Sequence, residues 1–363
     1  MEPLELPANC TALTATATDP AMRWFCQGSG VRECTNAHIA CTPAVPSSSS
    51  KGVVVFLPGT YLQPVDYSEI IAEFAYHGYH SLGLFYPSAE GQNGCGASRV
   101  ANPTDLNCTA VERFKVLTGA ANGGRTNVTR PDSIINRVAK ALLHLGEPWS
   151  DHVEPATGAV RWSGVTVAGH SNGADHAGFL SKNFTVSRAM LFAGPNDNVG
   201  PRGADSYYAP APWLFRNWTS SVPGERATPP ERLFGFGVCG SAQHPADDEC
   251  WHWQPGWAAM GMSSPWYRAD SLAVLSGARS FAGLHRLCSG ALLPHGSSPF
   301  GYNHMASAAD CCMPHFPANY STGGLAGRTL WTNVILHMLD DPIHSPDHAA
   351  PPAIPTNSCS CIA

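Results

Sequence analysis

Residues 165–173 read V-T-V-A-G-H-S-N-G, an apolar run that leads directly into a G-x-S-x-G pentapeptide centred on Ser171. Glycines two residues before and two residues after the serine let a strand and a following helix approach each other without a clash between Cβ atoms. The β-branched run predicts a buried strand, and residues 174–180 are compatible with a helix. The stretch therefore predicts a sharp strand-to-helix turn that holds the Ser171 hydroxyl out of the backbone.

Apolar segments on either side of this turn alternate between strand and helix patterns. Buried strands are expected at residues 53–57, 81–86, 189–193, 233–238 and 280–284. Helices are expected around residues 70–75, from Pro131 to about residue 145, and at 328–339. Such alternation is typical of an α/β fold, with a mostly parallel central sheet and helices on both faces.

Changes in composition divide the chain into segments. Residues 1–51 are expected to form a Cys-rich N-terminal extension with a Ser linker, and residues 341–363 a tail that contains Pro and Cys. The main domain is expected at 52–340, with a polar, Gly- and Asn-rich insertion or cap at 88–130.

Charge and hydropathy exclude several classes of partner. Of the 363 residues, 44% are hydrophobic, so a sizeable core can be buried. Only 13% are charged, and the net charge of −6 includes no basic tract, which argues against nucleic acid and anionic membranes as partners. No apolar run reaches the roughly 20 residues that a membrane span needs.

Thirteen cysteines occur along the whole chain, and none of them has the spacing of a zinc ribbon. Disulfides are therefore expected, and the odd number leaves at least one thiol free or paired between chains. A secreted or secretory-pathway protein is expected, although residues 1–18 contain no visible signal-peptide core. N-glycans are expected at six sequons: Asn9, Asn107, Asn127, Asn183, Asn217 and Asn319.

An exposed serine on such a turn becomes a nucleophile only with a base and a carboxylate nearby. On this kind of sheet the three residues follow the chain order Ser, acid, His. Asp247 and Asp248 follow the strand predicted at 233–238, and His304 lies after the last predicted strand. The choice between the two aspartates stays open. Two further alternatives are less favoured: His295 as the base and Asp197 as the acid.

The oxyanion that forms when a serine attacks a carbonyl needs two fixed N–H donors. The backbone amide of Asn172 comes directly after the serine, at the start of the predicted helix. The amide of Thr60 lies in the Pro58-Gly59-Thr60 turn after the first core strand. Both are expected to donate to the oxyanion.

With these motifs the chain resembles the α/β-hydrolase superfamily over about residues 52–340. Three segments resemble a poorly characterised group of predicted secreted serine hydrolases: 133–137 (S-I-I-N-R), 192–197 (F-A-G-P-N-D) and 304–310 (H-M-A-S-A-A-D). The resemblance implies Ser171 as nucleophile, His304 as base, Thr60 and Asn172 as oxyanion donors, and hydrolysis of a carboxylic ester through an acyl-enzyme. Asp247 and Asp248 lie about ten residues past Val238, where a Cys239–Cys250 disulfide would fold the loop back.

Other interpretations of the same residues give different functions. An acyltransferase would use the same acyl-enzyme, and an extracellular binding protein would keep the fold without the chemistry. A metal site at His244, Asp247, Asp248 and His252 is the less favoured interpretation, because the serine mechanism needs no metal or cofactor. The tryptophans at 251, 253, 257 and 266 predict either core packing or the wall of an acyl pocket. The expected partner is a small-molecule or polymeric ester.

Overall fold

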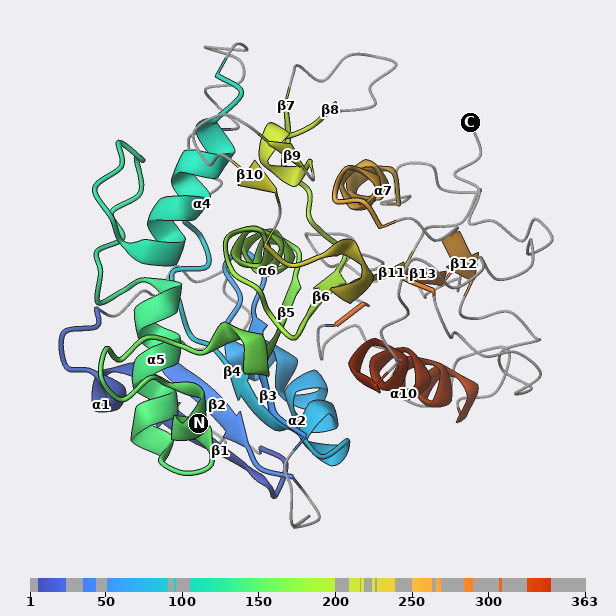
Figure 1. Ribbon diagram of the computed structural model, residues 1–363. Helices are drawn as coiled ribbons and strands as arrows, with labels where there is room; N and C mark the ends of the chain where they lie inside the picture. Colours follow the sequence, from blue (N-terminus) through green and yellow to red (C-terminus); the bar gives the residue numbers. More distant parts are fainter. Residues whose placement is uncertain are drawn as a thin grey trace.

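A mixed β-sheet organises the chain and contains most of the predicted strands (Figure 1). The computed structural model describes residues 6–23, 35–43, 51–90, 95, 105–199, 209–215, 217–218, 224–225, 227–238, 250–262, 266–268, 284–289, 307–308 and 325–340. The sheet has nine strands in these ranges, in the order β1 (Cys10–Thr14), β2 (Ala37–Cys41), β4 (His80–Gly83), β3 (Val53–Leu57), β5 (Val165–His170), β6 (Arg188–Phe192), β11 (Leu233–Val238), β13 (Arg286–Ser289) and β12 (Trp266–Arg268).

Most neighbouring strands of the sheet are parallel. Only the pairs β1–β2 and β2–β4 are antiparallel, so the prediction of a mostly parallel α/β sheet is confirmed. Strands β3 and β5 pair from Val53 opposite Val165 to Leu57 opposite Gly169. This register brings the carboxyl end of β3 beside the start of the G-x-S-x-G pentapeptide.

Short elements and helices connect the strands. The α-helices are α1 (Ala15–Thr18), α2 (Ser68–Tyr76), α4 (Cys108–Thr118), α5 (Ile134–Leu145), α6 (Asn172–Asn183), α7 (Cys250–Ala259) and α10 (Leu325–Asp340). Within the described ranges, no helix combines the length and the hydropathy that crossing a membrane requires. The 3-10 helices are η1 (Pro64–Tyr67), η2 (Trp149–His152), η3 (Trp162–Gly164), η4 (Pro212–Leu214) and η5 (Pro230–Arg232). Two small antiparallel sheets pair β7 (Asn198–Val199) with β8 (Ala209–Pro210) and β9 (Asn217–Trp218) with β10 (Gly224–Glu225).

Alternate residues of β3 enter two hydrophobic cores, one on each face of the sheet. Val53, Val55 and Leu57 pack with residues of α5 and α6, whereas Val54 and Phe56 pack with residues of α2 and α10. Successive side chains of a strand point to opposite faces, so a strand covered on both sides must be apolar at every position. The prediction of helices on both faces is therefore confirmed.

Strand β4 is shorter than predicted. The pattern at residues 81–86 predicts a strand to Tyr86, but β4 ends at Gly83. The backbone N–H of Phe85 donates to Nδ1 of His38 (2.9 Å), so it is not available to a neighbouring strand. A side chain that bonds to the backbone in this way ends the ladder.

The structure contains a strand just after the one predicted at 280–284. Residues 280–283 of the predicted strand lie outside the described residues, and Leu284 packs in the core without belonging to a strand. Strand β13 instead spans Arg286–Ser289, where it pairs with the last four residues of β11. Its sequence R-L-C-S is too short and too polar to show a continuous apolar run.

The N-terminal segment contributes two strands to the sheet. Strand β1 pairs with β2 so that Cys10 lies opposite Cys41, and a disulfide joins the two residues. Strand β2 in turn pairs with β4, which makes this segment the edge of the main sheet. The disulfide therefore joins two residues that are 31 positions apart in the sequence and that strand pairing already brings together.

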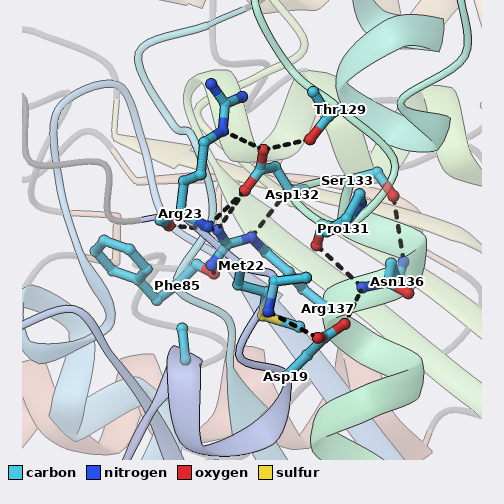
Figure 2. A network of polar contacts seen from close by, with 12 residues as sticks. Asp19, Met22, Arg23, Phe85, Thr129, Pro131, Asp132, Ser133, Asn136 and Arg137 are labelled. Carbon is cyan, nitrogen blue, oxygen red and sulfur yellow. Dashed lines mark hydrogen bonds and ion pairs between the residues drawn. The ribbon is translucent and has the colours of Figure 1, made fainter.

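A polar network around the buried Asp132 and Arg137 joins the same segment to the start of α5 (Figure 2). The carboxylate of Asp132 accepts hydrogen bonds from the backbone N–H and from Nε of Arg23, at 2.8 and 2.6 Å, and from Thr129. The buried Arg137 donates to Phe85 O (3.1 Å) and to Arg23 O (3.0 Å). Arg137 ends the S-I-I-N-R segment, so this motif joins helix α5 to the N-terminal segment.

Helix α5 begins three residues later than predicted. Pro131 precedes a turn, and the first helical residue is Ile134. The side chain of Ser133 accepts a hydrogen bond from the backbone N–H of Asn136 (3.3 Å), so Ser133 is the N-cap. A capping serine sets the start of a helix more strongly than a proline two residues before it.

The buried His38 predicts sensitivity to acid. Burial and, second, the positive charge of Arg137 lower the pKa of His38 from 6.5 to about 3. Below pH 6.5 the unfolded chain binds a proton at this residue that the folded chain does not bind until about pH 3. The stability from neutral His38 is complete above the unfolded pKa and is lost as the pH falls, by about 2 kcal/mol between pH 8 and pH 5.

A His38→Asn variant tests this, because its side-chain oxygen replaces Nδ1 as the acceptor for Phe85 N–H and does not titrate. We expect its free energy of unfolding, measured by urea denaturation at several pH values, to vary less than that of the wild type. An identical pH dependence of the two proteins would show that His38 contributes nothing.

Candidate active site

The turn after β5 has the backbone of a nucleophile elbow. Ser171 has φ 53° and ψ −122°, between the last residue of β5 and the first residue of α6. Its N–H donates to Phe192 O (2.9 Å), and its carbonyl accepts from the N–H groups of Ala174 (2.8 Å) and Asp175 (3.1 Å). Ser171 is partly exposed, whereas His170 and Asn172 on either side are buried. The structure therefore holds one serine in a left-handed, solvent-accessible position.

Two glycines make this turn possible. A Cβ atom at Gly173 would overlap the carbonyl oxygens of Leu57 and Pro58, at the end of β3. A Cβ atom at Gly169 would overlap the backbone of Gly173 and Ala174. The predicted reason for glycines at these two positions, close approach of strand and helix, is therefore confirmed.

The turn after β3 lies beside the elbow. The carbonyl of Gly59 accepts from the N–H of Leu62 (3.1 Å), and Tyr61 has a φ of 63°, so the chain reverses tightly through Thr60. Thr60 is partly exposed. Asn172 is the first residue of α6, where the helix supplies no carbonyl for its N–H. The two predicted oxyanion donors are thus at the same edge of the sheet, on adjacent strands.

The side chain of His170 lies behind the serine. Its Nδ1 is 2.8 Å from the hydroxyl of Tyr67. Both side chains are buried, and Tyr67 belongs to the core on the α2 and α10 face. These contacts give His170 a structural role in the elbow.

A buried arginine lies on the other side of the elbow. Arg113 of α4 is fully buried and donates to Asp175 (2.8 Å), to both carboxylate oxygens of Asp197 (3.0 Å each) and to the side-chain oxygen of Asn172. It also lies 3.0 Å from Nε2 of His176. These five residues are called the ionic cluster below. The cluster connects α4, the first turn of α6 and the segment after β6.

Electrostatics determine the protonation of the ionic cluster. Burial raises the pKa of Asp175 to about 7, although the charge of Arg113 opposes this shift. Burial and, second, the same charge lower the pKa of His176 well below its ordinary value, so its Nε2 accepts from Arg113. Burial alone would lower the pKa of Arg113, but Asp197 and Asp175 raise it. The cluster therefore contains one cation that two carboxyl groups share.

Asp197, the less favoured candidate for the acid, belongs to this cluster. Its Oδ1 accepts from Arg113, and its Oδ2 accepts from Arg113 and from Nε1 of Trp213 (2.9 Å). Both oxygens therefore have donors within the core. This arrangement favours a structural role for Asp197.

The predicted base and acid lie outside the described residues. His304, its rival His295, and both Asp247 and Asp248 fall in segments that the structure does not describe. The described chain enters these segments from β11 and β13, which are adjacent and parallel. Both strands also run parallel to β5 through β6, so their carboxyl ends lie at the edge of the sheet that carries Ser171.

Two of the tryptophans at 251, 253, 257 and 266 pack in the core. Trp253 and Trp257 of α7 are fully buried, with 4.5 Å between their ring centroids, and they lie against Gly235 and Gly237 of β11. Trp257 Nε1 donates to the carbonyl of Gly194 at 2.5 Å. The side chains of Trp251 and Trp266 lie outside the described residues.

Metal ligands were the less favoured interpretation of the segment after β11. Within the ranges that the structure describes, no group of three or more His, Cys, Asp or Glu side chains is placed to hold a metal ion. His244, Asp247, Asp248 and the side chain of His252 lie outside those ranges.

Sequence reasoning missed the ionic cluster and helix α4. The composition of residues 88–130 predicts a polar insertion and shows no helix. Helix α4 of this segment packs against α5 and α6, and the disulfide Cys95–Cys108 includes its first residue. The buried face of α4 includes Glu112 and Arg113, so it lacks an apolar stripe. No local pattern in the sequence marks Arg113 as buried.

Comparisons with known proteins give no family. No protein-family model matches the chain, and no curated protein matches it. Among solved structures, apo Thermogutta terrifontis esterase 2 is 13% identical, with 67% of this chain and 75% of that chain covered and a TM-score of 0.30. The same esterase phosphorylated by paraoxon is 12% identical, with 67% of this chain and 74% of that chain covered and a TM-score of 0.29. TT1662 from Thermus thermophilus is 12% identical, with coverages of 84% and 94% and a TM-score of 0.35. Similarities this low carry no argument about function.

The ionic cluster predicts a large difference between two arginines. Arg113→Met leaves two buried carboxyl groups without their cation, so we expect the free energy of unfolding to fall by about 3–5 kcal/mol. Arg161→Met is the matched control, because Arg161 forms an ion pair with Glu154 (2.9 Å) in which both side chains are about half exposed. The control should lose at most about 1 kcal/mol. Equal losses in urea denaturation would contradict the role of the cluster.

Proposed function

We propose that the chain is a serine hydrolase of the α/β-hydrolase type that cleaves carboxylic esters through an acyl-enzyme. The observation that carries the proposal is the backbone of Ser171, with its φ of 53° at the junction of β5 and α6. Such conformations cost about 1–3 kcal/mol and persist where the surrounding structure requires them. In this proposal the strain is retained because it presents the Ser171 hydroxyl to a substrate.

The proposed reaction begins when Oγ of Ser171 attacks the ester carbonyl and His304 accepts the hydroxyl proton. Asp247 or Asp248 orients the imidazole and stabilises its cationic form. His304 then gives the proton to the leaving alcohol, and the acyl group remains on Ser171. Water, deprotonated by the same imidazole, releases the acid and regenerates the serine.

The backbone amides of Thr60 and Asn172 stabilise the oxyanion in both steps of the proposed scheme. Their support is the register of β3 and β5, which brings the two turns to the same edge of the sheet. The start of α6 adds the positive end of the helix dipole at Asn172. The scheme requires no metal and no cofactor.

Strand order supports the choice of acid and base. Ser171 follows β5, the segment with Asp247 and Asp248 follows β11, and the segment with His304 follows β13. In a parallel sheet these segments all leave from the same edge. The order Ser, acid, His is the one that serine hydrolases on such sheets use.

The acyltransferase alternative differs only in the second step, where an alcohol or amine replaces water as the acyl acceptor. No observation among the described residues favours it. Product analysis in the presence of a competing alcohol separates transfer from hydrolysis.

We further propose that the protein is secreted or enters the secretory pathway. The disulfides Cys10–Cys41 and Cys95–Cys108, together with a disulfide at Cys288, support an oxidising environment. The exposed position of Asn127 is compatible with an N-glycan there. Glycans at the remaining sequons belong to the same proposal. The natural substrate in this proposal is a small-molecule or polymeric ester.

A covalent probe tests the nucleophile. A fluorophosphonate should label the wild-type protein on one residue and should not label Ser171→Ala, because only an activated serine attacks the phosphorus. The labelled peptide is identified by mass spectrometry. Labelling of the Ser171→Ala variant, or an unlabelled wild type, would refute the proposal.

Substitutions at the predicted base and acid give the second test. His304→Ala should lower kcat on a reactive aryl ester by at least about 10³-fold, because the serine loses its base. His295→Ala is the matched control and should retain kcat within about twofold of the wild type. Of Asp247→Asn and Asp248→Asn, one should lower kcat by about 10²-fold or more and the other should not. Normal activity in His304→Ala would show that another group is the base.

A further inference from the structure

One peptide group in the turn after β3 makes hydrogen bonds to side chains through both its carbonyl and its N–H. The group joins Pro58 to Gly59. Its carbonyl accepts a hydrogen bond from the hydroxyl of Tyr86 (2.7 Å), and its N–H donates to the hydroxyl of Tyr67 (3.1 Å). A trans peptide group is planar, with its C=O and N–H on opposite edges, so two such bonds fix the rotation of the whole plane.

The two tyrosines come from opposite faces of the sheet. Tyr67 ends η1 and belongs to the core on the α2 and α10 face, whereas Tyr86 follows β4 and belongs to the core on the α5 and α6 face. Both are almost fully buried, at 0% and 3% exposure. Burial raises the pKa of Tyr86, so its hydroxyl keeps the proton that it donates to Pro58. Neither bond competes with bulk water.

The next peptide group carries the amide of Thr60. The carbonyl of Gly59 accepts from the N–H of Leu62 (3.1 Å), and the N–H of Thr60 is therefore directed to the opposite edge of that plane. Rotation of the Pro58–Gly59 plane would change the direction of this N–H, because the two planes share the Cα of Gly59. A side chain at Gly59 would contact the Tyr67 hydroxyl at 3.0 Å, so the plane has little room to move.

Tyr67 also connects this turn to the elbow. Its hydroxyl accepts from Gly59 N–H and lies 2.8 Å from Nδ1 of His170, the residue before Ser171. With its single proton the hydroxyl can donate to Nδ1 while it accepts from Gly59. One buried oxygen thus sets the separation between the turn that carries Thr60 and the strand end that carries Ser171.

We propose that Tyr67 and Tyr86 are positioning residues of the oxyanion hole, which hold the Pro58–Gly59 peptide from both faces of the sheet and so aim the Thr60 amide at the substrate oxygen bound to Ser171. The inference rests on the proposed serine-hydrolase function. Neither tyrosine contacts the reacting atoms. Each acts through the backbone.

Loss of one complete oxyanion donor lowers kcat by about 10²–10³-fold. Tyr67→Phe and Tyr86→Phe keep the rings and remove only the hydroxyls, so the Thr60 amide is loosened rather than lost. We expect each variant to lower kcat by about 10-fold and the double variant by about 10²-fold, with KM within about twofold of the wild type. The change falls on kcat because the oxyanion exists only after attack.

Tyr79→Phe is the matched control. Tyr79 is also buried, and its hydroxyl also bonds to the protein, at 2.8 Å from Oδ1 of Asp340. It precedes β4, at the edge of the sheet opposite to Ser171. This variant therefore loses a buried hydroxyl of the same kind but should keep the wild-type kcat.

A reversible alkylboronic acid supplies the second readout, because its tetrahedral adduct with serine places an oxygen in the oxyanion hole. We expect its inhibition constant to rise in the two tyrosine variants by the same factor by which kcat falls, and to be unchanged in Tyr79→Phe. Loss of a merely structural bond would lower the melting temperature of all three variants and leave both readouts unchanged.

Fluorophosphonate labelling of the wild type separates the two possible failures. If the wild type is labelled on Ser171 but the double variant keeps kcat and the boronate inhibition constant within twofold, the inference is wrong and the proposed function stands. If the wild type is not labelled, the proposed function fails, and the inference fails with it.

Discussion

Helix α6 starts against the carboxyl end of β3 with no space for a side chain between them. A Cβ atom at Gly173 would occupy the position of two carbonyl oxygens, those of Leu57 and Pro58. This steric constraint forces the chain to turn within one residue, and that residue is Ser171, with its positive φ. The position of the hydroxyl, the direction of the first amides of α6 and the proximity of the turn after β3 all follow from the same contact.

Two groups of polar residues hold this contact from either side. Behind the helix, Arg113 binds the side chains of Asn172 and Asp175 in the first turn of α6. On the strand side, the hydroxyls of Tyr67 and Tyr86 hold the turn after β3. Buried polar groups of this kind specify one arrangement, because any displacement leaves a donor or acceptor without a partner.

Arg113 reaches the elbow from helix α4, outside the central sheet. Helix α4 lies between β4 and α5 in the sequence, and the disulfide Cys95–Cys108 holds its start. A second buried arginine, Arg137, joins helix α5 to the N-terminal segment through Asp132 and the carbonyl of Arg23 (Figure 2). Peripheral segments thus stabilise the sheet through ionic contacts as well as through apolar burial.

The sequence predicts the central strands and the elbow because each has a local signal. A continuous β-branched run marks β3, and glycines at fixed spacing mark the turn at Ser171. The roles of Arg113, Tyr67 and Tyr86 have no such signal. The partners of Tyr86 and Arg113 lie 28 to 84 residues away along the chain, and Tyr67 joins two residues that are 8 and 103 positions from it. The short strand β13 is not apparent in the sequence, because pairing with β11, rather than its own composition, makes it a strand. The acid and the base remain predictions from chain order.

A crystal structure of the protein after reaction with a fluorophosphonate tests the central claim most directly. The account predicts a phosphorus atom bonded to Oγ of Ser171, with its oxygen about 2.7–3.1 Å from the backbone nitrogens of Thr60 and Asn172. The imidazole of His304 should lie within hydrogen-bond distance of Oγ. A phosphonyl oxygen that points away from both amides, or a His304 side chain remote from Ser171, would contradict the account.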